Sequence, residues 1–281
     1  MRLLWILPKH YFACILLLLF SCSSDYPSIR VNAGGQSIRE RIAAPVGYAW
    51  INEPSGSFGA YLQNALLLPD GSKIVDFKGN PIANQSEHVA ILNYDVGKKD
   101  LQQCADAVIR LRAEYLFSEE RYDEIGFHFT SGHLFKWNDY KKGIRPIVSK
   151  NNLVTFKKLA PSDYSYASFR KYLDVIYTYA GTISLNKETI KVIKDSSIKT
   201  GDILITAGSP GHVVVIVGRA KAKSSGKIVF LIAEGYTPAQ SIHILTNPYH
   251  GKLNPWYTLF VSDRLTVTAR YTFSKTNIRS F

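Results

Sequence analysis

The stretch Gly201–Gly218, GDILITAGSPGHVVVIVG, constrains the fold of this chain more than any other part of its sequence. It holds two apolar, β-branched runs, Ile203–Thr206 and Val213–Val217, separated by the turn-forming Ser209-Pro210-Gly211. Runs of this kind on either side of a Gly/Pro turn predict two neighbouring strands. His212 is the one polar residue at the start of the second strand, where it is either a catalytic base or a histidine satisfied by the turn.

Three further apolar runs follow, and the segments between them are rich in residues that favour turns. They are Ile228–Ala233, Ile242–Leu245 and Tyr257–Val261, and the loop AKAKSSGK (residues 220–227) joins the first of them to the preceding strand as a wide hairpin. An earlier strand is expected at HVAILNY, and a hairpin is expected within residues 68–82, around two Gly turns. Helices followed by an antiparallel sheet make an α+β fold.

The clearest helical pattern covers Asp100–Phe117, with Asp100 as the expected N-cap. Cys104 lies on its apolar stripe, while Arg110 is spaced to pair with Asp106 and Glu114 on the outer side. A second long helix is expected at Tyr166–Ala180, capped by Ser165 and ended by Gly181, and a short one at SFGAYLQNALL, started by Ser55 or Ser57.

The N-terminus has the composition of an export signal. Arg2 and Lys9 precede the apolar run YFACILLLLF, which is shorter than the roughly 20 residues of a membrane-spanning helix. The residues that end it, Leu19-Phe20-Ser21-Cys22, resemble the lipobox of bacterial lipoproteins, in which the cysteine is lipidated after cleavage. Ordinary signal cleavage, with Cys22 as a chance thiol, is the alternative.

We therefore expect a signal peptide at residues 1–21, a lipidated N-terminus and tether at 22–35, and a single globular domain at 36–281. Such a protein is held at a membrane of the cell envelope by its lipid. Ser23 follows the cysteine, which in enterobacterial lipoproteins points to the outer membrane.

Charge and cysteine content limit the partners and the chemistry. Without residues 1–21 the chain has 32 basic and 22 acidic residues, a net charge of +10. An exported protein of this charge is expected to meet anionic envelope polymers such as peptidoglycan rather than nucleic acid. Cys14 leaves with the signal and Cys22 is acylated, so Cys104 is the one remaining thiol; it is either buried and inert or reactive.

A reactive cysteine needs a group that stabilises its thiolate. The start of a helix and a nearby imidazole both do so, which makes Cys104 and His212 a candidate nucleophile and base. Glu234 is placed to orient the imidazole, with Gln240 as the alternative. Gln103 or the Cys104 N–H is a candidate for the oxyanion. The competing interpretation is a core thiol, a turn histidine and a solvated strand-end acid.

The order of a helix-start cysteine, Gly201-Asp202-Ile203 and the run HVVVIVG resembles the NlpC-type and CHAP-type branch of the papain-like fold. That resemblance implies a cysteine peptidase or amidase acting on cell-wall peptides, with His212 as the base and Glu234 as its orienting residue. It implies a core in which the helix carrying Cys104 packs on an antiparallel sheet. A helical insertion is then required around residues 118–195.

Several longer sequence segments resemble those of the bacterial family called domain of unknown function 4846. Among them are DVGKKDLQQCADAVIRLRAEYL, SPGHVVVIV, TPAQSIHIL and NPWY. Its members are mostly secreted proteins or lipoproteins, and it implies no activity. Three hypotheses remain: a cysteine hydrolase, a non-catalytic lipoprotein that binds a ligand or partner, and an acyltransferase.

The sequence predicts no cofactor and no metal site. His128 and His133 are five residues apart, with no acid or cysteine in ligand register.

Overall fold

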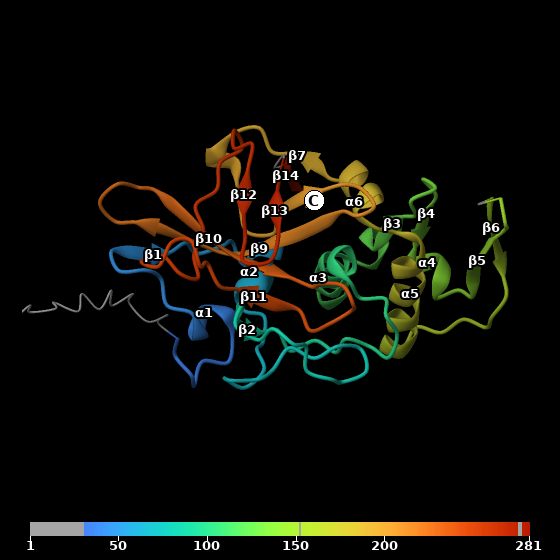
Figure 1. Cartoon of the computed structure of the whole chain (residues 1–281). Helices are drawn as coiled ribbons and strands as arrows, with labels where there is room; N and C mark the ends of the chain where they lie inside the picture. Colours follow the sequence, from blue (N-terminus) through green and yellow to red (C-terminus); the bar gives the residue numbers. More distant parts are fainter. Residues whose placement is uncertain (1–30, 152, 275–276) are drawn as a thin grey trace, which may run out of the picture.

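The computed structural model describes residues 31–151, 153–274 and 277–281 (Figure 1). The predicted signal peptide, the predicted lipidation site Cys22 and most of the predicted tether lie outside these residues. Within the described ranges, no helix has the length and apolar character needed to cross a membrane.

One antiparallel sheet organises the molecule, and the predicted α+β class is confirmed. In spatial order its main strands are β2 (His88–Ile91), β11 (His243–Leu245), β10 (Ile228–Glu234), β9 (His212–Ala222), β8 (Ile203–Thr206), β14 (Asn277–Ser280) and β7 (Ile190–Lys191). A short strand, β1 (Tyr48–Trp50), pairs with the distal end of β9.

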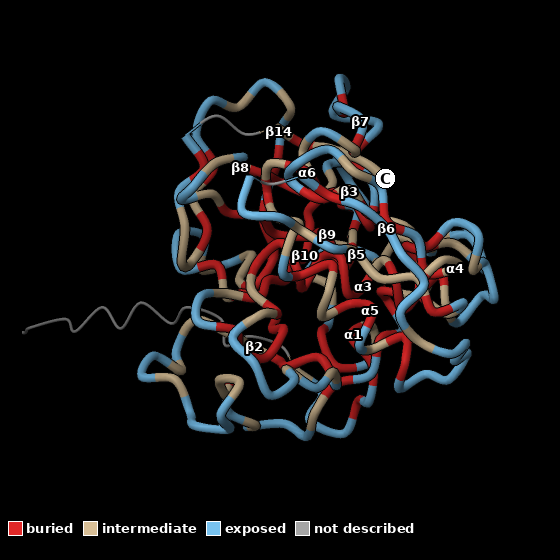
Figure 2. The backbone as a smooth tube through the Cα atoms, turned by 90° about the vertical axis from the view of Figure 1, so that its right-hand side faces the viewer, coloured by how far each residue is buried: buried red, intermediate tan, exposed pale blue. Residues whose placement is uncertain are grey.

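Strand β9 is buried on both faces, which explains its uninterrupted apolar run. Side chains alternate across a sheet, so Val213, Val215 and Val217 enter one core while Val214 and Ile216 enter the other. The first core is covered by α1 (Ile38–Arg41), α2 (Phe58–Gln63) and α3 (Cys104–Ser118). The C-terminal segment covers the second with β12 (Thr266–Val267) and β13 (Thr272–Phe273). Buried residues accordingly gather around β9, β10 and α3 in Figure 2.

The segment between α3 and β8, where a helical insertion is expected, is mixed rather than helical. It extends to one side of the sheet in Figure 1 and contains two separate two-stranded sheets among its helices. Its elements are η1 (Tyr122–Glu124), β3 (Gly126–His128), β4 (Leu134–Lys136), α4 (Trp137–Tyr140), β5 (Ile144–Val148), β6 (Val154–Lys158), α5 (Tyr166–Tyr179), α6 (Thr182–Glu188), β7 and η2 (Asp195–Ser197). Stacked aromatic rings such as Phe117 with Phe169 join it to α3.

Helix α3 begins four residues later than the sequence pattern predicts. Gln103 is the N-cap, and the carboxylate of Asp100 accepts hydrogen bonds from the Gln103 side chain and from the backbone of Ala239. Cys104 is consequently the first helical residue. The expected outer face of α3 is wrong as well, because the insertion buries Arg110 and Glu114, which form an ion pair at 2.6 Å.

The other local predictions have mixed outcomes. Ser57 and Ser165 cap α2 and α5 as expected, and β8 to β11 lie where strands are predicted. Helix α5 ends at an Ala180 cap rather than at a left-handed Gly181. Residues 68–82 form only isolated bridges, from Val75 to Pro81 and from Asp76 to Gln240, and the run at 257–261 contributes a single bridge from Tyr257 to Phe230.

Candidate functional site

Cys104 and His212 come from two elements that pack directly on each other. Helix α3 lies against β9 and β10, with Cys104 at its N-terminus and His212 as the first residue of β9. The turn before β9 places the histidine here. Both side chains are largely buried, with 9% of Cys104 and 3% of His212 exposed. The thiol therefore lies at the end of a helix dipole that stabilises negative charge.

Gly235, directly after β10, allows this close approach. A Cβ at this position would lie 2.8 Å from the Cβ of Ala107 and 3.0 Å from the carbonyl oxygen of Gln103, both on or next to the first turn of α3. No side chain fits there without moving the helix that carries Cys104.

Gly235→Ala is therefore expected to destabilise the protein by about 1–3 kcal/mol, because the added methyl group overpacks the contact between β10 and α3. Thermal unfolding followed by circular dichroism measures the loss, expected as a fall of roughly 2–12 °C in midpoint. Gly181→Ala is the matched control, since a Cβ there meets no atom within 4 Å. Equal midpoints for the two variants would contradict the packing argument.

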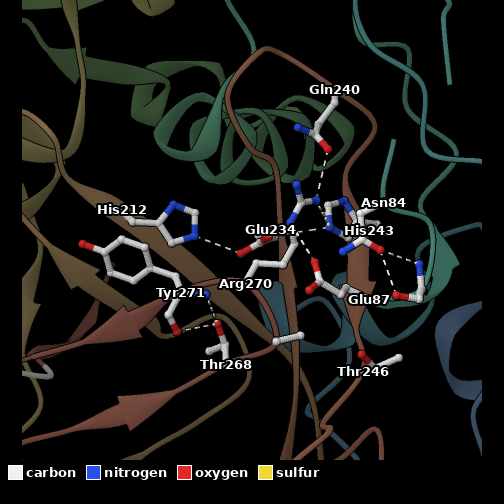
Figure 3. Close-up of polar contacts among 12 residues, drawn as sticks. Asn84, Glu87, His212, Glu234, Gln240, His243, Thr246, Thr268, Arg270 and Tyr271 are labelled. Carbon is white, nitrogen blue, oxygen red and sulfur yellow. Dashed lines mark hydrogen bonds and ion pairs between the residues drawn. The ribbon is translucent and has the colours of Figure 1, made fainter. Parts of the chain in front are cut away.

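The structure places Glu234 beside His212, as the sequence hypothesis requires. Glu234 ends β10, the neighbouring strand, and its Oε2 lies 2.9 Å from Nε2 of His212 (Figure 3). The carboxylate is fully buried. A hydrogen bond of this kind fixes the orientation of the imidazole and favours its protonated form.

The electrostatics of the pair favour a charged imidazole. Burial by itself lowers the pKa of His212, but its neighbours Cys104 and Glu234, the latter hydrogen-bonded to the imidazole, raise it overall to about 9. Burial raises the pKa of Glu234, but the hydrogen bond and charge of His212, together with the nearby His243, lower it overall to about 2. At neutral pH the site therefore holds an imidazolium beside the carboxylate of Glu234.

Behind this pair lies a group of residues that the sequence hypothesis does not include. Nε of Arg270 and Nε2 of His243 lie 3.6 and 3.7 Å from Oε1 of Glu234, the oxygen that His212 does not use. Arg270 also contacts His243 and donates to the side chain of Gln240 (Figure 3). Arg270, which belongs to the C-terminal segment, thus contacts the carboxylate of Glu234. No local motif marks it, since it reaches the site only through the tertiary structure.

Three aromatic rings pack around the imidazole of His212. The ring of Tyr271 lies 4.6 Å from that of His212, and the rings of Tyr236 and Phe273 lie at 5.2 and 5.9 Å. Two of these residues come from the C-terminal segment that covers the second core. The low dielectric that they create strengthens the pairing between His212 and Glu234.

A pocket of ≈ 340 Å³ opens beside the thiol. Cys104 lines it together with Gln103, Asp106, the loop at 208–211 and Thr237. Its lining contains two acids, Asp100 and Asp106, and no Lys or Arg. Burial raises the pKa of Asp106 well above its usual range, and its Oδ1 has no hydrogen-bond partner among the described residues. The thiol consequently faces a polar space with room for a ligand.

The two glutamines that the sequence singled out lie in different surroundings. Gln103 lines the pocket, where its Nε2 donates to Asp100 and its Oε1 accepts from Thr237. Gln240 is buried against Arg270, and its Nε2 donates to the carbonyl of Pro238. Gln240 is not among the residues that line the pocket, and its side chain bonds to Arg270 and Pro238 instead of His212.

No group of three or more His, Cys, Asp or Glu side chains within the described residues could hold a metal ion. His128 pairs with Glu188 at 2.9 Å, and His133 lies against the hydroxyl of Ser131.

Residues 38–280 match the model of one family, whose description is domain of unknown function (4846). The chain belongs to this family, as its characteristic phrases indicate. No curated protein matches the sequence, and no solved structure matches the fold.

Proposed function

We propose that this protein is a cysteine hydrolase of the cell envelope, with Cys104 as nucleophile, His212 as acid and base, and Glu234 as the residue that orients the imidazole. The observation that carries the proposal is the buried His212–Glu234 pair beside a pocket that a helix-start thiol lines. A core thiol without function would not need a buried charged pair next to it, because burying charges is costly.

The arrangement suits the cleavage of an amide through a thioester. The thiolate of Cys104 attacks the carbonyl carbon, and the imidazolium of His212 gives its proton to the nitrogen that leaves as an amine. His212 then takes a proton from water as the water attacks the thioester, and Cys104 leaves as its thiolate when the acid product departs, which restores the starting thiolate and imidazolium. Glu234 keeps its negative charge throughout and holds the imidazole in place.

The negative oxygen formed during the attack needs donors that face the pocket. The backbone N–H of Cys104 is one, because the first residues of a helix have no intrahelical acceptor for their N–H groups. The second hydrogen on Nε2 of Gln103 is the other, since the first one is used by Asp100. Together they form a small oxyanion hole at the start of α3.

The arrangement of the helix, the sheet and the three residues supports a papain-like core. The substrate that we propose is an amide in cell-wall peptides or a related acyl compound. The lining of the pocket has no Lys or Arg that could pair with an anion, which favours a substrate that is uncharged next to the scissile bond. The signal-like N-terminus and Cys22 support attachment to a membrane, the outer one in preference to the inner, through a lipid.

Alkylation of Cys104 by iodoacetamide tests the proposal without knowledge of the substrate. The rate for an unassisted thiol falls roughly 80-fold between pH 8 and pH 6, since only the thiolate reacts. Beside the His212 imidazolium the rate is expected to fall less than about threefold over this range. Peptide-level mass spectrometry at timed intervals measures Cys104 separately from the other cysteines.

His212→Gln should restore the steep pH dependence of an ordinary thiol, whereas His133→Gln, at a distant and partly exposed histidine, should leave the rates unchanged. A thiol that reacts only after unfolding would contradict the proposal and favour a non-catalytic, ligand-binding lipoprotein.

A further inference from the structure

A second cavity, of ≈ 460 Å³, lies far along α3 from the thiol pocket and is unusually basic. Four cationic side chains line it, namely Arg112, Arg121, Lys199 and Arg219, and the only acid in its lining is Glu53. Helix α3, the residues before α2, the turn before β8 and the end of the chain at Phe281 form its walls. Arg112 follows Cys104 by eight residues, or about 12 Å along the helix axis.

Two of the four cations already have partners. Arg219 pairs with Glu53 at 2.8 Å, and its Nε and Nη2 both donate hydrogen bonds to the Glu53 carboxylate. Arg121 pairs with Glu124 at 2.6 Å. Among the described residues, no ion pair or hydrogen bond engages the side chain of Arg112 or of Lys199. The lining therefore holds more cationic than acidic side chains, and two of the cations have no ion-pair partner among the described residues.

The guanidinium of Arg112 is held in a fixed position. It lies over three rings, those of Phe58, Tyr115 and Phe281, at 5.2–5.3 Å from their centroids. Burial lowers the pKa of Arg112, which indicates that its positive charge is partly desolvated. A guanidinium fixed between aromatic rings, with free N–H groups, is pre-organised to bind a planar or tetrahedral oxyanion.

We propose that this cavity binds a small molecule carrying a carboxylate or phosphate group, with Arg112 as the principal ligand of the anion and Lys199 as a second cation. The volume falls within the range of small-molecule sites, and the surrounding rings suit an apolar or flat part of the ligand. This site does not depend on Cys104, because the two cavities share no lining residue.

Binding of sodium benzoate and of inorganic phosphate to the purified protein tests the proposal. Isothermal titration calorimetry at constant ionic strength is the measurement, and at least one of the two anions is expected to bind with a millimolar or lower Kd. Arg112→Gln should weaken that binding at least tenfold. Lys199→Gln changes an exposed side chain that does not enter the core and should weaken it severalfold, which keeps the test valid if the first variant does not fold.

Arg264→Gln, at an exposed arginine outside the cavity, is the matched control and should bind as the wild type does. Cys104→Ser should also bind normally, which separates this proposal from the hydrolase. The proposal is overturned if neither anion binds, if Arg112→Gln and Lys199→Gln both bind like the control, or if only vesicles containing phosphatidylglycerol bind. That last result would mean a membrane-surface contact instead of a small-molecule site.

Discussion

Cys104→Ala is expected to abolish hydrolysis of soluble peptidoglycan fragments, with a loss on the order of 10⁴-fold or more, because removal of a nucleophile eliminates the covalent step. Mass spectrometry of the fragments with time, together with the appearance of new amino groups, measures the rate. The free energy of unfolding should change by less than about 2 kcal/mol, since the side chain removed is small and lies at the rim of the pocket.

Ser118→Ala is the matched control for this experiment. It lies at the opposite end of α3, is exposed, and donates only to the carbonyl of Tyr115. Cys104→Ser should be nearly as inactive as the alanine variant, because a hydroxyl is a far weaker nucleophile than a thiolate at neutral pH. Undiminished hydrolysis by Cys104→Ala would rule out the thioester mechanism.

Glu234→Gln is expected to have the largest effect on stability, and the effect should depend on pH. Glutamine keeps the size of the side chain and can still bond to His212, but it removes the charge that the imidazolium faces. The pKa of Glu234 is lowered from 4.5 to about 2, which corresponds to roughly 3 kcal/mol of stability at pH values where the carboxylate is ionised in both folded and unfolded protein. The variant should lose about this amount.

The pH range of this stability difference follows from the pKa shifts of Glu234 and His212. A carboxyl with a lowered pKa stabilises the fold above 4.5 and loses this contribution as pH falls towards 2. A histidine with a raised pKa stabilises the fold below 6.5 and loses this contribution as pH rises through about 9. The difference between wild type and Glu234→Gln should therefore be largest between pH 4.5 and 6.5 and shrink on both sides.

Urea unfolding at pH 3, 5.5 and 9.5 measures these differences. Glu119→Gln, at an exposed glutamate of the same charge, should remain within about 0.5 kcal/mol of the wild type at each pH. A loss for Glu234→Gln that stays constant from pH 3 to 9.5 would show that the stability does not come from the charged pair.

The strands around His212 could be predicted because their signals are local. The run VVVIV is apolar at every position, and a run of this kind is stable only where both faces of the strand are covered. The Ser209-Pro210-Gly211 turn marks the start of β9, and Glu234 marks the end of β10. Because β9 and β10 are adjacent antiparallel strands, they place His212 and Glu234 side by side, and this pair could therefore be predicted from the sequence.

The start of α3 and the surroundings of Arg110 could not be predicted in the same way. Asp100 has the spacing of a capping residue, but the tertiary contact with Ala239 uses its carboxylate and moves the helix start to Cys104. Arg110 has the spacing of an exposed ion pair, but the insertion covers it. In both cases a long-range contact takes the place of the local one.

By itself, the sequence determined the α+β class, the family, the strand run that holds His212, and Cys104 as the thiol to consider. Periodicity, turn residues and family-specific sequence segments are properties of short stretches of the chain, so they can be recognised without knowledge of the fold. Only the tertiary structure decided that Cys104 is the first residue of its helix, that Arg270 and His243 back Glu234, and that Arg112 lies unpaired in a basic cavity. These facts depend on contacts between segments up to 170 or so residues apart, and the packing of the whole domain sets such contacts.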